Sequence, residues 1–102
     1  MEVRITGKHG GLGGGVWYVG RVGGYHFEAL VFAESSQYGI DGGPVSKLYL
    51  WAGPKKKRGE TLAVYERGWE LGPGEALQEV VTQIVADLSQ REREQHETEH
   101  RG

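Results

Sequence analysis

The sequence predicts an α+β domain: an antiparallel sheet of four or five strands, connected as a meander, with one C-terminal amphipathic helix packed on one face. Two patterns support this fold class. Short runs with alternating apolar and polar residues recur from Val3 to Arg67, which is the period of half-buried strands. From Gly74 onward the apolar residues recur at helical spacing instead.

The predicted strands are separated by residues that favour turns. Val3–Thr6 is expected as a short first strand, followed by a flexible, glycine-rich connector at 7–15. Gly23 and Gly24 form a two-residue hairpin turn between two neighbouring strands. Trp69–Leu71 is expected to lead into the helix. The other strands are expected at Val16–Val22, Tyr25–Phe32, Val45–Trp51 and Thr61–Arg67.

A single apolar stripe marks the helix, which is expected to end near Arg91–Glu94. The residues beyond it have no apolar face, so we expect one domain at 1–95 and a flexible polar tail at 96–102. The stripe covers one face of the sheet. The other face is expected to meet solvent, a ligand or another subunit. The stripe consists of Leu77, Val80, Val81, Ile84, Val85 and Leu88.

The composition excludes several classes of protein. The chain of 102 residues has no cysteine, which rules out disulfide frameworks and thiol nucleophiles. Its net charge of −2 gives no overall basic field for DNA or RNA. No apolar run approaches the roughly 20 residues that cross a bilayer. We therefore expect a cytoplasmic protein without membrane, DNA or RNA partners.

Several motif-like stretches are better explained without a catalytic, metal-binding or phosphate-binding role. His96–His100 matches the H-E-x-x-H pattern of zinc peptidases, but its flanks are wholly charged, which favours a solvated tail. Gly10–Gly15 lacks the helix that follows a phosphate loop, and Lys55–Arg58 is typical of a charged hairpin tip. His26 and Glu28 could form an acid–base couple, although a cross-strand pair is favoured. We expect no enzyme, no metal site and no cofactor.

The candidate site is the long polar excursion Glu34–Lys47 between two apolar runs, because long loops in compact domains usually have a function. Glycine lets backbone amides approach a ligand, and hydroxyls can bond phosphate or ribose oxygens. The alternative is a loop whose polar groups satisfy only each other. The candidate ligand-binding residues are Ser35, Ser36, Tyr38, Gly39, Gly43, Ser46 and Lys47, joined by Arg67 and Trp69 from a neighbouring strand.

The stretch YHFEALVFAESSQYGIDGGPVSKL, followed by YERGW, resembles a family of small domains in phages and prophages of Gram-positive bacteria. The resemblance covers the chain from Trp17 to Leu88. The motif residues are Tyr25, Phe27, Ala29, Val31, Phe32, Ser36, Gly39, Ile40, Gly43, Val45, Ser46, Lys47 and Leu48, and then Tyr65, Glu66, Arg67, Gly68 and Trp69.

This resemblance implies a phage protein that acts in the host-cell cytoplasm and inhibits antiphage defence. The chain is similar in kind to an anti-CBASS sponge, which sequesters a cyclic nucleotide immune signal. We therefore expect binding of a cyclic dinucleotide or related signal by a homo-oligomer, a dimer or tetramer, whose symmetry matches a two-fold ligand. The alternative is a protein-binding, anti-CRISPR-like inhibitor that acts through the open face of the sheet.

Overall fold

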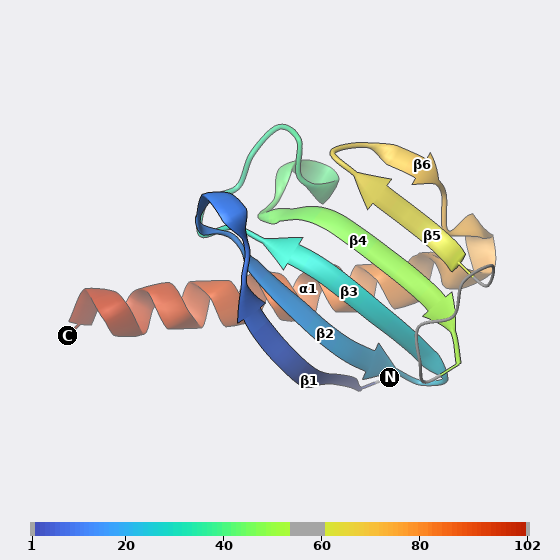
Figure 1. The fold of residues 1–102 in the computed structure, drawn as a ribbon, viewed down its shortest axis with the longest axis horizontal. Helices are drawn as coiled ribbons and strands as arrows, with labels where there is room; N and C mark the ends of the chain where they lie inside the picture. Colours follow the sequence, from blue (N-terminus) through green and yellow to red (C-terminus); the bar gives the residue numbers. More distant parts are fainter. Residues whose placement is uncertain (1, 54–60, 102) are drawn as a thin grey trace.

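In the described residues, six antiparallel strands form one sheet and a single long helix covers one of its faces (Figure 1). The computed structural model describes residues 2–53 and 61–101, except the side chains of Leu12 and residues 95–101. The strands lie in the order β1-β2-β3-β4-β5-β6, which confirms the α+β meander. The elements are β1 (Val3–Gly10), the 3-10 turn η1 (Leu12–Gly14), β2 (Val16–Val22), β3 (Tyr25–Val31), the 3-10 turn η2 (Ile40–Gly42), β4 (Val45–Ala52), β5 (Thr61–Glu66), β6 (Trp69–Leu71) and α1 (Gly74–Arg101).

The prediction of four or five strands is wrong, because the chain forms more sheet than its propensities indicate. β1 does not end at Thr6; a register shift between Ile5 and Gly7 carries the strand on to Gly10. Trp69–Leu71 does not merely lead into the helix but pairs with β5 as β6. Pairing with a neighbouring strand outweighs the weak β propensity of glycine and the shortness of β6.

α1 is also longer than the sequence predicts, since it continues to Arg101 instead of ending near Arg91–Glu94. Its last turns are rich in Gln, Arg and Glu, which have high helix propensity even where no apolar face is buried. Figure 1 shows this end of the helix extending beyond the sheet. The helical backbone therefore includes most of the segment expected as a tail, and the flexibility of 96–102 stays a prediction.

The core lies between α1 and one face of the sheet. The predicted helical stripe is confirmed, with Ile84 and Leu88 fully buried and Leu77 and Val85 partly buried. Phe27 on β3 is fully buried among the residues that the stripe covers. Each large apolar side chain buried in this way contributes about 1.5–3 kcal/mol. The strand residues of this core are Tyr18, Val22, Phe27, Ala29, Val31, Val45, Leu48, Leu50, Ala63 and Tyr65.

Gly20 is required where β2 passes beneath the ring of Phe27, its cross-strand partner. A Cβ at Gly20 would lie 2.8 Å from the Phe27 ring and 2.5 Å from the carbonyl oxygen of Arg4. The ring thus occupies the space that a side chain would need. Because the second obstacle is backbone, a larger residue would displace β1 from the sheet.

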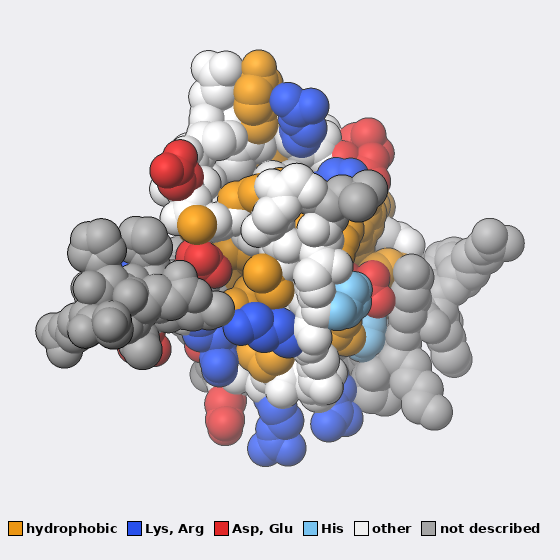
Figure 2. Space-filling model, turned by 60° about the vertical axis from the view of Figure 1, so that its left-hand side comes forward, with side chains coloured by type: hydrophobic (Ala, Val, Ile, Leu, Met, Phe, Trp, Pro, Cys, Tyr) orange, Lys and Arg blue, Asp and Glu red, His pale blue; other side chains and the backbone are white. Residues whose placement is uncertain are grey.

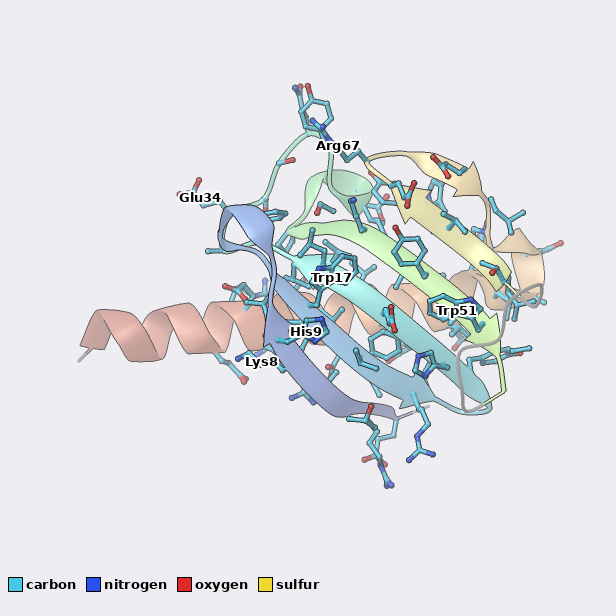
Figure 3. The ribbon with its side chains drawn as sticks, in the orientation of Figure 1. Lys8, His9, Trp17, Glu34, Trp51 and Arg67 are labelled. Carbon is cyan, nitrogen blue, oxygen red and sulfur yellow. The ribbon has the colours of Figure 1, made fainter. Side chains whose placement is uncertain are left out.

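The open face, which is the face turned away from α1, carries a row of aromatic rings. The ring centroids of Trp17 and Tyr49 are 6.2 Å apart, and those of Tyr49 and Trp51 are 5.9 Å apart. Figure 3 shows Trp17 and Trp51 on the side of the sheet away from the helix. Offset stacking of such rings stabilises a sheet face beyond the area that it buries.

The glycine-rich segment packs on this open face instead of forming a free connector. The amide of Gly11 donates to the carbonyl oxygen of Gly15 at 2.7 Å, which folds the segment back. A Cβ at Gly15 would lie 2.8 Å from Leu30 Cδ1 and 3.0 Å from the Phe32 ring. The missing side chains therefore let the backbone cover Leu30, which is only 8% exposed although α1 lies on the other face.

We expect Gly20→Ala to lower the free energy of unfolding by about 1–3 kcal/mol, the usual cost of forcing atoms into a packed core. Chemical denaturation monitored by tryptophan fluorescence measures the change. Gly24→Ala is the matched control, because a Cβ at Gly24 meets no atom within 4 Å. Equal stability of the two variants would contradict the packing of Phe27 on Gly20.

Candidate functional site

The excursion between β3 and β4 forms a compact loop at one end of the sheet (Figure 1). Ile40, the first residue of η2, is 4% exposed and packs in the hydrophobic core, so it anchors the loop. Asp41 follows with φ of 53°, a left-handed conformation that is uncommon for a residue other than glycine. The remainder of the excursion is shaped by hydrogen bonds within it.

Five backbone amides of this loop donate to acceptors of the same loop. The amide of Ser36 donates to the carbonyl oxygen of Gly43 at 3.2 Å, and that of Gly39 donates to Ser36 at 3.0 Å. The amide of Tyr38 donates to Ser36 Oγ at 2.9 Å. The amides of Gly42 and Gly43 bond the carbonyl oxygens of Gly39 and Ile40. These N–H groups do not point outward to an anion, so the alternative of a loop that satisfies itself accounts for them.

Gly39 and Gly43 have a packing role in the same loop. A Cβ at Gly39 would lie 1.9 Å from the carbonyl oxygen of Gly43, and one at Gly43 would lie 3.2 Å from that of Ile40. Gly39 has an ordinary φ of −77°, so glycine is needed there for space and not for backbone freedom. The close approach of the two glycines closes the loop on itself.

Two contacts hold Tyr38 of the loop against β5 and the β5–β6 turn, and a third joins that turn to Ser46 at the start of β4. The Arg67 guanidinium carbon lies 4.3 Å from the centroid of the Tyr38 ring, a cation–π contact. The Tyr65 hydroxyl donates to the carbonyl oxygen of Tyr38 at 2.7 Å, and the Arg67 amide donates to that of Ser46 at 3.1 Å. Trp69 meets the Tyr65 ring edge-on, with centroids 5.1 Å apart.

The structure thus brings together Tyr38, Ser46, Arg67 and Trp69, as the sequence predicts, although most of their contacts are with the protein itself. Figure 3 shows Arg67 at the loop tip, which lies at the top of the molecule in Figure 1. In Figure 2, a hydrophobic and a basic side chain lie side by side at the top of the molecule. Arg67 has φ of 63°, a strained backbone that the surrounding contacts must hold in place.

Lys47 follows Ser46 on β4. It is the cross-strand partner of Leu30 and Glu66, which places its side chain on the open face. Ser35 is exposed beside Glu34, in the part of the loop that follows β3.

The titratable side chains described on the open face form hydrogen bonds and contacts with one another. Tyr49 donates to Glu66 Oε1, and burial, followed by this hydrogen bond, raises the pKa of Tyr49 above its usual value, so the phenol stays protonated at neutral pH. His26 Nε2 is buried without a hydrogen-bond partner and lies 3.9 Å from Glu28 Oε1. Across the described residues, no group of three or more His, Asp or Glu side chains is placed to hold a metal ion.

A groove beside β6, here called the β6 groove, is not predicted by the sequence. It has a volume of about 610 Å³ and lies between η2, β6 and the exposed side of α1. Of the large hydrophobic residues described, Tyr38, Trp69 and Leu71 are the exposed ones, at 46%, 43% and 46%. The pair of apolar residues between Gly68 and Gly72 was the available signal. The lining residues are Ile40, Asp41, Trp69, Gly72, Pro73, Gln78, Val81, Thr82, Val85 and Ala86.

Two stretches singled out in the sequence lie outside this description. Lys55–Arg58 falls within the undescribed residues 54–60, and His96–His100 falls where side chains are not described. No helix in the described part of the chain combines the length and apolar character needed to cross a membrane.

We expect Tyr65→Phe to lower the free energy of unfolding by about 1 kcal/mol, because it leaves the carbonyl oxygen of Tyr38 without its donor. Limited proteolysis should also cleave the 34–44 loop faster. Tyr25→Phe is the control, since the Tyr25 hydroxyl has no hydrogen bond among the described residues. Unchanged stability and an unchanged rate of proteolysis in Tyr65→Phe would contradict the attachment of the loop to Tyr65.

Comparison with known proteins gives a family but no activity. Residues 16–89 match the family model described as Domain of unknown function (DUF7678). No curated protein and no solved structure matches the chain. The matched region runs from β2 into α1. It contains the excursion, the contact between Tyr38 and Arg67 and the β6 groove, whereas β1 lies before it. The chain belongs to the DUF7678 family.

Proposed function

We propose that this protein is a non-enzymatic binding protein and that its partner is another protein, docked in the β6 groove. The carrying observation is that Trp69, which is 43% exposed, lines the groove together with the apolar residues Ile40, Val81 and Val85, while Leu71, 46% exposed, belongs to the same edge strand. Contiguous apolar surface of this kind on a small domain is typical of an interaction site.

The edge of the sheet supports an extended partner segment. Among the described strands, β6 lies at the edge of the sheet and pairs with β5, so its outer side can accept an added strand. Trp69 lies opposite Tyr65, and Leu71 lies opposite Val64 on the other face. Successive side chains of an added strand point to opposite faces and would therefore contact Trp69 and Leu71 in turn.

The charge around the groove favours a basic partner. Among the described residues that line it, Asp41 is present and Lys and Arg are not. Glu75 and Glu79 are exposed and precede Gln78 and Thr82 of the lining by three residues each, which places them beside the groove on the surface of α1. We therefore propose an occupant with apolar side chains next to Lys or Arg, since complementary charge raises the association rate and excludes wrong partners.

The open face, which the sequence favoured for a protein partner, supports this role less well. Leu30 and Trp51 on that face are only 8% and 5% exposed, and the Tyr49 hydroxyl is bonded to Glu66. The resemblance to phage domains directs the search for a partner to host defence proteins. In that setting the protein would act as an antidefence inhibitor through the β6 groove.

A photo-crosslinking amino acid at Thr82 tests the docking site in host lysate. Thr82 lines the groove, whereas Gln83, the neighbouring exposed helix residue, does not. We expect position 82, but not position 83, to crosslink to one protein. Thr82→Arg should then weaken binding of that purified partner at least tenfold while Gln83→Arg leaves it unchanged. Equal crosslinking from both positions, or crosslinking only to a second copy of this chain, would contradict docking of a partner protein in the β6 groove.

A second candidate, sequestration of a cyclic nucleotide signal by a homo-oligomer, is supported by the Tyr38–Arg67 tip. Tyr38 is 46% exposed with the Arg67 guanidinium 4.3 Å from its ring centroid, so a base and a phosphate could meet side chains there. The hydroxyls of Ser35, Ser36 and Ser46 lie in the same segment and could bond ribose or phosphate oxygens. Because the loop amides are internally bonded, side chains would carry this affinity.

Calorimetry against a panel of cyclic dinucleotides and glycosylated ADP-ribose signals tests this second candidate. If it holds, one nucleotide binds reversibly and is released intact. Arg67→Gln should then weaken binding at least tenfold, whereas Arg93→Gln, a charge-matched change on the exposed part of α1, should have no effect. Absence of binding to every member would contradict sequestration of a nucleotide signal, and protein binding in the β6 groove would remain as the proposed function.

A further inference from the structure

Two arginines lie directly opposite each other on the open face, far from the β6 groove. Arg4 of β1 and Arg21 of β2 are cross-strand partners at the end of the sheet where β1 begins and β2 ends (Figure 1). Both are exposed, and both line a pocket of about 310 Å³ together with Glu2 and Gly23. The antiparallel strands β1 and β2 thus present two arginine side chains to one pocket.

The pairing is costly for the protein alone. Like charges directly opposite each other in a sheet repel, and arginine stays protonated at any ordinary pH. Among the described residues, neither Arg4 nor Arg21 has an ion-pair partner within 4.0 Å, although Glu2 shares the pocket. Exposed repulsion of this kind is relieved when an anion binds between the two groups.

The neighbouring strands do not supply the missing negative charge. The cross-strand row continues from Arg21 to His26 on β3 and to Trp51 on β4, and it contains no carboxylate. The carboxylates of this face belong to other rows: Glu28 lies opposite Val19 and Tyr49, and Glu66 lies opposite Lys47. The row that begins with the arginines is therefore the basic end of the open face.

The pocket also has room for a ligand above the hairpin turn. Gly23 forms that turn with φ of 58°, and a Cβ built on it would meet no atom within 4 Å. Gly23 therefore leaves its side of the pocket of about 310 Å³ open, and Arg4 and Arg21 line the same pocket. Each guanidinium can donate two parallel hydrogen bonds, a geometry that matches phosphate oxygens.

We propose that Arg4 and Arg21 form a binding site for the phosphate groups of a small ligand, such as a diphosphate or a nucleoside diphosphate. A dianionic group between the guanidinium groups removes their mutual repulsion and forms charge-assisted hydrogen bonds to both. Glu2 at the rim of the pocket competes with the ligand for the same cations. β1 lies before the residues matched to the family, so the family match does not imply this site.

Titration of the full chain with inorganic pyrophosphate and with adenosine diphosphate at low ionic strength tests the proposal. We expect saturable binding by calorimetry and a rise in the melting temperature. Tighter binding of the nucleotide would support a nucleoside diphosphate, and equal binding would support the phosphate groups alone as the recognised chemistry. No saturable binding of either probe at millimolar concentrations would overturn the site.

Matched variants separate the pocket from general charge. Arg4→Gln and Arg21→Gln should each weaken binding about tenfold or more, the usual loss for a charge-assisted hydrogen-bond pair. Glu2→Gln should tighten binding, because it removes the competing carboxylate. Arg93→Gln and Glu94→Gln make the same charge changes on α1 and should leave affinity unchanged. A loss in Arg93→Gln as large as that in Arg21→Gln would contradict a local site. All five positions are exposed, so each variant should keep the fold.

Discussion

Burial of one face of the sheet beneath α1 is the constraint on which the rest of the structure depends. The helical stripe and the strands beneath it remove enough apolar surface from water to order a small domain without cysteine. The same core includes Ile40, so the long excursion is anchored in it and cannot swing freely. From that anchor, the contact between Gly39 and Gly43 closes the loop and uses its amides internally. The polar composition of the excursion is explained by its own folding.

The surfaces left outside this core differ in character, which allows separate roles for them. The open face is partly closed by its own aromatic row and by the glycine-rich segment over Leu30. The β6 edge leaves Trp69 and Leu71 exposed beside an apolar groove with acidic neighbours. The far end of the open face presents Arg4 and Arg21 with no described ion-pair partner. An apolar, acid-rimmed groove suits a basic polypeptide, whereas paired guanidinium groups suit phosphate.

Periodicity predicted the parts of the fold that depend on local pattern. The stripe from Leu77 to Leu88 and the strand Val16–Val22 needed only residue spacing. β6 could not be found this way, because three residues have no measurable period and their pairing with β5 decides their state. The candidate site shows the same division. Arg67 and Tyr38 were placed together from their positions in neighbouring segments, but the direction of the loop amides depends on an approach of two glycines that composition does not reveal.

The claim that the excursion is folded upon itself, with its amides turned inward, is tested most directly by amide hydrogen exchange in the free protein. The account predicts that the amides of Gly39, Gly42 and Gly43 exchange slowly, since each donates to a carbonyl oxygen of the loop and the loop is anchored by the buried Ile40. Exchange of all three at the rate of an unstructured chain would contradict it. In that case the loop would be open, and its amides would again be free for an anionic ligand.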